Sequence, residues 1–125
     1  MAYPTGTGSE ILRRGKWRDQ SSTSTAFIFD GTDPSVGTSS YTVPALHIIT
    51  ILNIIVCEQG GNTSEIEIKY ADETRLCDVQ SIGPSETFVF SEKIVLIGGD
   101  GLKFVISSAG NVDVSYCYFD QNWID

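Results

Sequence analysis

Residues 86–123 alternate short apolar segments with tight-turn residues, and this pattern limits the possible folds more than any other feature of the chain. The turn segments 98–101 and 108–111 contain Gly, Asn and Asp, which adopt the positive φ angles that hairpin turns need. The apolar segments are rich in Val, Ile, Phe and Tyr, which suit a pleated, half-buried strand. The pattern predicts antiparallel β-structure with four strands, at 87–90, 93–97, 102–107 and 112–119.

Four earlier segments also have the composition of strands, and they complete the predicted fold. No helical period is present, so about eight short antiparallel strands predict an all-β fold, a β-sandwich with jelly-roll-like topology. A simpler meander sandwich has the same number of strands, and the sequence leaves this alternative open. The four earlier segments are 25–29, 46–57, 65–70 and 74–79.

The first 23 residues differ from the rest of the chain, because they are rich in Gly, Ser and Thr and lack a clear period of two. They predict an extended N-terminal arm over 1–23, followed by a β-sandwich domain over 24–125. A total length of 125 residues is typical of a single domain.

Basic charge is concentrated in this predicted arm. The net charge of the chain is −8, yet four of its eight Lys and Arg residues lie between positions 13 and 18. An acidic body repels phosphate backbones, so nucleic acid is not expected as a partner. A solvated basic face would explain the cluster, but the Trp within it favours a docking element for a protein partner. The predicted partner-binding residues are Arg13, Arg14, Lys16, Trp17 and Arg18.

Residues 46–57 are apolar on both faces of the predicted strand, more than one side of a sandwich needs. A subunit interface would cover the surplus, which predicts a homotrimer. The single histidine lies in this segment and is interpreted as a core or interface residue. The predicted interface residues are His47, Ile49, Ile51 and Ile55.

Residues that could support catalysis are few. The only histidine, His47, lies between Leu46 and Ile48 in the most apolar segment, so neither a His-paired nucleophile nor a multi-histidine metal site is expected within one chain. The three cysteines form no CxxC motif. We therefore expect no enzymatic activity, no metal, no cofactor and no small-molecule substrate. The longest apolar run has 12 residues interrupted by polar ones, too short to span a bilayer, so no membrane partner is expected.

The segments GTGSEILRRGKW and ETFVFSEKIVLIGGDGLKFVISSAGNVDVSYCYFDQNW, together with the plan of an arm before an acidic β-domain, resemble small structural proteins of tailed-bacteriophage virions. The resemblance is to head decoration, or cement, proteins. It implies synthesis in the host cytoplasm, a place on the head surface, and trimers that bind the major capsid protein and stabilise its lattice. A tail or fibre protein, or a host-glycan-binding β-sandwich module, shares the same plan and is the alternative.

Overall fold

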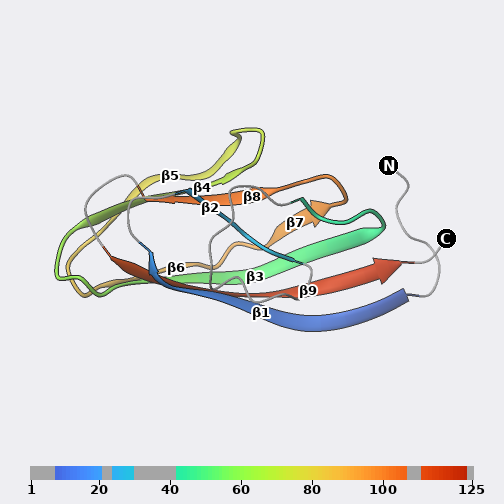
Figure 1. Cartoon of the computed structure of the whole chain (residues 1–125), viewed down its shortest axis with the longest axis horizontal. Coiled ribbons are helices and arrows are strands. Elements are labelled where there is room, and N and C mark those ends of the chain that lie inside the picture. The colour runs from blue at the N-terminus through green and yellow to red at the C-terminus, as the bar shows by residue number, and fades with distance from the viewer. Residues whose placement is uncertain (1–7, 21–23, 30–41, 107–110, 124–125) are drawn as a thin grey trace.

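The computed structural model describes residues 8–20, 24–29, 42–106 and 111–123, which form two antiparallel sheets packed face to face (Figure 1). The prediction of an all-β sandwich is confirmed. Nine strands are present in this part of the chain: β1 (Gly8–Gln20), β2 (Ser24–Ala26), β3 (His47–Glu58), β4 (Ser64–Tyr70), β5 (Arg75–Ile82), β6 (Thr87–Phe90), β7 (Ile94–Ile97), β8 (Leu102–Ile106) and β9 (Val112–Trp123).

The strand order is that of a jelly roll rather than of a meander. One sheet has the order β1-β9-β3-β6, with β7 also pairing with β3, and the other has the order β2-β8-β4-β5. Strands β6 and β7 pair with successive halves of β3, so together they occupy one position in the sheet. Counted in this way, each sheet has four strand positions, and the chain passes repeatedly from one sheet to the other.

An aromatic cluster fills the centre of the sandwich and joins the two sheets. The ring centroids of Trp17 and Phe27 are 4.7 Å apart, those of Phe27 and Tyr116 are 4.8 Å apart, and those of Phe29 and Tyr118 are 5.1 Å apart. The Tyr116 hydroxyl donates a hydrogen bond of 3.2 Å to the Ile28 carbonyl, so its polar end is satisfied inside the core.

The segment predicted as an arm differs in the structure. Residues 8–20 form β1, which pairs with β9 from Gly8 opposite Trp123 to Gln20 opposite Val112. Trp17 is 1% exposed and belongs to the core. Strand β1 packs on its own domain because its inward positions 15 and 17 carry Gly and Trp, which fit around the ring of Tyr116. Residues 1–7 and 21–23 of the predicted arm lie outside the described residues.

A β-bulge in β3 changes which of its side chains face the core. The pairing of β3 with β9 shifts between Ile51 and Asn53, which inserts one extra residue, Leu52. Ile49 and Ile51 before the bulge, and Ile54 after it, are all fully buried in the core. Ile49 and Ile51, predicted as interface residues, are therefore core residues. A strict period of two cannot anticipate a bulge, because one added residue reverses every later side chain.

Candidate protein-binding face

The outer face of the five-stranded sheet carries an apolar row of side chains that the core does not cover. Leu12 of β1 lies opposite Phe119 of β9, Phe119 opposite Thr50 of β3, and Thr50 opposite Val95 of β7. These residues point away from the core, because their neighbour Tyr118 points into it. Leu12 is 61% exposed and Val95 is 55% exposed.

A second row crosses the same face. Lys16 lies opposite Ser115, Ser115 opposite Ile55, and Ile55 opposite Val89 of β6. Ile55 is 37% exposed and Val89 is 52% exposed. Four of the seven large apolar side chains that are exposed within the described residues thus lie on this one face. Scattered exposed apolar residues need no explanation, but their concentration on one face indicates a binding surface.

Basic side chains border this apolar surface. Arg14 and Lys16 are exposed on the outer face of β1, and Arg18 is exposed near the end of the same strand. Among the described side chains that point outward from these strands, the acidic ones are Glu10 at one end and Asp113, whose Oδ1 accepts a 3.1 Å hydrogen bond from Gln59 Nε2. We call the surface formed by Leu12, Arg14, Lys16, Ile55, Val89, Val95 and Phe119 the outer face.

A shallow hollow lies on the outer face between β1 and β3, and its volume is 320 Å³. It combines two cations with the apolar side chain of Ile55 and the thiol of Cys57. We call it the β1–β3 hollow. Its lining residues are Lys16, Trp17, Arg18, Ile55, Cys57, Asp113, Val114 and Ser115.

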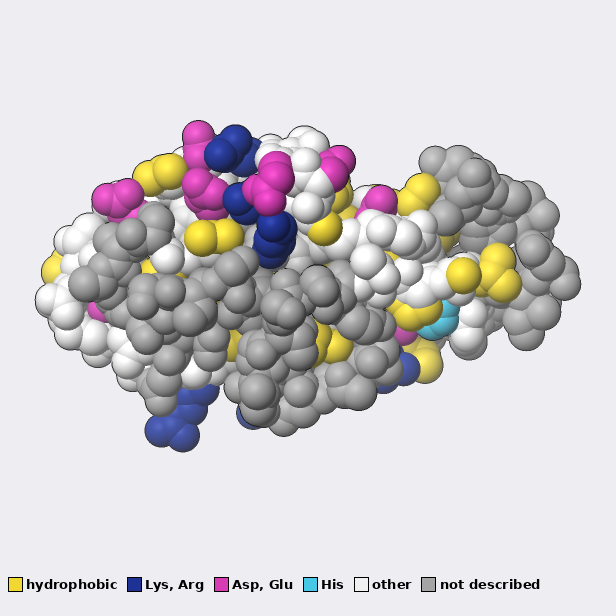
Figure 2. Space-filling view, turned by 45° about the horizontal axis from the view of Figure 1, so that its top comes forward, with side chains coloured by type: hydrophobic (Ala, Val, Ile, Leu, Met, Phe, Trp, Pro, Cys, Tyr) yellow, Lys and Arg dark blue, Asp and Glu magenta, His cyan; other side chains and the backbone are white. Residues whose placement is uncertain are grey.

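The outer side of the four-stranded sheet has a different character, because its charged side chains pair with one another. Figure 2 shows dark blue and magenta side chains gathered over this sheet. Lys103 Nζ donates a 2.6 Å hydrogen bond to Glu73 Oε1, and Lys69 forms an ion pair with the same carboxylate. These two lysines lower the pKa of Glu73 to about 2. Arg75 is paired as well, with Asp78 at 3.2 Å, so little charge on this side is left for a partner.

A small charged cluster lies on the inner side of the five-stranded sheet, beyond the aromatic core. Asp120 is buried there, and its Oδ1 lies 2.7 Å from His47 Nδ1 while its Oδ2 lies 3.4 Å from Arg13 Nε. Arg13 and His47 therefore share one carboxylate within the chain. The sequence does not predict this cluster, because its members lie far apart in the chain, on β1, β3 and β9.

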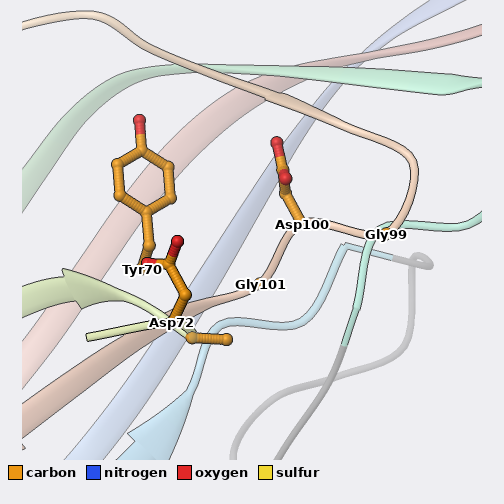
Figure 3. A pocket seen from close by; sticks show the side chains of 6 residues that line it. Tyr70, Asp72, Gly99, Asp100 and Gly101 are labelled. Carbon is orange, nitrogen blue, oxygen red and sulfur yellow. The ribbon is translucent and has the colours of Figure 1, made fainter. Parts of the chain in front are cut away.

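A second hollow, also of 320 Å³, is lined by Tyr70, Ala71, Asp72, Gly99, Asp100 and Gly101. Figure 3 shows that Tyr70 and Asp100 point the same way from two separate segments. Both carboxylates cap their own turns: Thr74 N donates to Asp72 Oδ1 and Ile97 N donates to Asp100 Oδ2, each at 3.0 Å. The hydrogen bond from Thr74 lowers the pKa of Asp72. These contacts give both acids a structural role.

The structure separates the predicted site residues into three groups. Arg14, Lys16, Arg18 and Ile55 come together on the outer face, Arg13 and His47 meet at Asp120, and Trp17, Ile49 and Ile51 are buried in the core. The sequence did not identify Leu12, Val89, Val95 and Phe119 as parts of a surface. Alternation within 87–90 and 94–97 was available as a signal, but the pairing of both segments with β3 was not.

Within the described residues no three His, Cys, Asp or Glu side chains are grouped as ligands for a metal ion. The same residues contain no helix that is long and apolar enough to cross a membrane.

No family model and no curated protein matches the chain. Among solved structures, a chain from the acidic stable capsid structure of Helicobacter pylori bacteriophage KHP30 is similar, with a TM-score of 0.52 and 8% identity over 92% of this chain and 90% of that chain. A chain from Bacillus endospore appendages, which form disulfide-linked pili, gives a TM-score of 0.49 and 9% identity over 100% and 96% of the two chains. A chain from the infectious bursal disease virus Gx strain gives 0.49 and 10% over 96% of this chain and 32% of that chain. The likeness to the phage capsid chain is one of fold.

Proposed function

We propose that this protein is a structural component of a tailed-phage virion that decorates the head surface and stabilises the lattice of the major capsid protein. The observation that carries the proposal is the outer face, where exposed apolar side chains lie beside a row of cations on β1. A surface of this composition is suited to binding another protein, since apolar contacts supply affinity and charges supply orientation.

The fold supports the same role. Jelly rolls serve in viral capsids as well as in lectins, and the fold likeness to the KHP30 capsid chain extends over 92% of this chain. Fold alone does not fix function, so the proposal depends on the outer face.

A glycan-binding role has less support from the described aromatic residues. A sugar-stacking platform needs exposed rings, but the rings of Trp17, Tyr116 and Tyr118 are buried in the core. Of the other Trp and Tyr residues, Tyr70 is half-buried, Tyr3 and Tyr41 lie outside the described residues, and so does the side chain of Trp123.

We include the homotrimer and the absence of enzymatic activity in the proposal. Repetition around a threefold axis would raise the avidity of modest contacts. Light scattering at micromolar concentration should return the mass of three chains, and a monomer mass would contradict the proposed homotrimer. Purified protein should hold no stoichiometric metal and should not hydrolyse phosphate esters, esters or glycosides.

Co-sedimentation with phage heads tests the decoration role. Expanded heads that lack this protein should bind it to saturation at a fixed ratio to the major capsid protein, and decorated heads should withstand higher temperature. A glycan array run in parallel separates the alternative. Binding to glycans without binding to heads would replace the decoration role with a fibre role.

A further inference from the structure

We propose that the β1–β3 hollow binds an acidic segment of a partner protein, with a carboxylate beside Lys16 and a small apolar side chain against Ile55. The inference refines the proposed function, because it names the chemistry of the partner and the part of the outer face that binds it. It depends on the pattern of charge and apolar surface around the hollow.

The charges around the hollow favour an acidic partner. Lys16 and Arg18 line one side of it, on the edge strand of a chain whose net charge is −8. The lining also contains one acidic residue, Asp113, which accepts a hydrogen bond from Gln59 at 3.1 Å, so the two cations leave the lining with a net positive charge. An incoming carboxylate would therefore meet Lys16, which is exposed, across the floor formed by Ser115.

The apolar side chains around the hollow supply the affinity that exposed ion pairs cannot. An exposed ion pair contributes little to affinity because water and salt screen it, whereas apolar surface contributes in proportion to the area removed from water. Ile55 lies directly between Ser115 and Val89, so a bound segment that covers the hollow also covers Ile55. A carboxylate and a small apolar residue two positions apart match this arrangement, because side chains at positions i and i+2 of an extended segment lie on the same face.

A second copy of this chain fits the hollow less well. Two outer faces stacked on each other would bring the Arg14 and Lys16 rows of both copies onto one interface. The acidic side chains over the four-stranded sheet are already paired with Lys69, Lys103 and Arg75. An acidic segment of a different protein brings no further cations to the interface, and its carboxylates do not have to leave ion pairs within this chain.

Three free cysteines allow the site to be mapped without introducing a label. Cys57 lines the hollow and Cys117 lies on the outer face one row away, opposite Asn53. Cys77 lies on β5 in the other sheet, where burial raises the pKa of its thiol. Each thiol is compared with itself in the presence and absence of a ligand, so slow alkylation of Cys77 does not affect the comparison.

The experiment uses the full chain and a short peptide with the repeat Glu-Ser-Val-Ser as the probe, which places glutamate and valine on one face of an extended segment. Binding is followed by calorimetry, and the alkylation rate of each cysteine is followed by mass spectrometry. We expect the peptide to slow alkylation of Cys57 at least threefold, with a smaller effect at Cys117 and none at Cys77. Added salt should weaken binding, and a control peptide with the repeat Lys-Ser-Val-Ser should not bind.

Charge reversal supplies the matched variants. Lys16→Glu should weaken peptide binding at least tenfold, whereas Lys93→Glu, on the opposite edge of the same sheet, should change it less than twofold. The proposal is overturned if neither peptide binds, if Lys16→Glu binds as well as the unaltered chain, or if protection appears at Cys77 and not at Cys57. Self-association of this protein that protects Cys57 from alkylation in the absence of peptide would also overturn the proposal. Peptide binding by a protein that does not bind phage heads would leave this site in place and remove the decoration role.

Discussion

The carboxylate of Glu58 accepts a 2.8 Å hydrogen bond from the backbone N–H of Ser85, which fastens the end of β3 to the loop between β5 and β6. The same carboxylate accepts hydrogen bonds from the backbone N–H groups of Gly60 at 2.8 Å and Gly61 at 3.2 Å. Glu58 is buried, so these donors replace the water that the charge has lost. One side chain thereby holds two loops at the same end of the sandwich.

These hydrogen bonds predict that the stability of the protein depends on pH through Glu58. The bond from Ser85, followed by those from the other backbone donors, lowers the pKa of Glu58 below its ordinary value of 4.5. A lowered folded pKa contributes stability that is fully present above the unfolded value and is lost as pH falls through the folded one. Glu58→Gln should therefore be less stable than the unaltered chain at about pH 7, and the difference should shrink below about pH 4.

Urea unfolding followed by circular dichroism at several pH values measures this effect. Glu92→Gln is the control, because Glu92 is exposed in the turn between β6 and β7. If Glu58→Gln and Glu92→Gln have the same urea midpoint at neutral pH, the carboxylate does not hold the two loops.

A second prediction concerns Gly15 in the middle of β1. A Cβ atom at this position would overlap the ring of Tyr116, so no larger side chain fits without movement of the core. Gly15→Ala should lower the free energy of unfolding by about 1–3 kcal/mol, the usual cost of overpacking. Ser115→Ala, on the exposed side of β9, is the control. Equal urea midpoints for the two variants would show that the ring moves aside at no cost.

Gly15 also shows why the sequence predicts the sandwich but not β1. Segments such as 102–106 and 112–119 carry dense β-branched and aromatic residues, so local composition is sufficient to identify them. On the inward side of β1, Ile11 is 46% exposed, Arg13 and Gly15 are not typical core residues, and Trp17 is buried in the core. Gly15 is inward because the Tyr116 ring covers it, and that contact joins residues far apart in the chain. Tertiary contacts of this kind cannot be derived from local patterns.

The sequence predicts the basic part of the candidate site but not its apolar part. The basic residues of β1 are adjacent in sequence, so the sequence identifies them as a cluster. Their apolar neighbours Ile55, Val89 and Val95 come from three other strands, and strand order brings them to the same face. The bulge at Leu52 also decides that Ile55 faces outward while Ile51 faces inward.

A third prediction concerns the acidic residue that bridges two lysines over the four-stranded sheet. Lys69 and Lys103 lie opposite each other on β4 and β8, and Glu73 binds both. Because the pKa of Glu73 is lowered to about 2, its carboxylate should stay charged far below the ordinary value of 4.5. Its contribution to stability is then present above about pH 4.5 and is lost only as pH falls toward 2.

Carboxyl carbon chemical shifts measured by NMR across an acid titration test this directly. In Lys103→Met the Glu73 shift should move at a higher pH than in the unaltered chain, because the first of its two cationic partners is gone. An unchanged titration of Glu73 would mean that Lys103 does not bind it in solution. Since Glu73 is exposed, we expect a small effect of this variant on stability.

The last prediction separates the two roles that Trp17 can have. A Trp among basic residues would be an anchor for a partner if its ring were exposed, and its replacement would then weaken binding and leave stability unchanged. In the structure the ring is 1% exposed and packs 4.7 Å from Phe27 and 5.5 Å from Tyr116. Trp17→Ala should therefore lower the free energy of unfolding by about 3–5 kcal/mol, as expected for removal of a large core aromatic residue. Lys16→Ala, one position away on the outer face, should change it by less than about 0.5 kcal/mol and should instead weaken partner binding. Urea unfolding and peptide calorimetry on both variants give the two readouts, and a stable Trp17→Ala variant that no longer binds would place the ring at the partner interface.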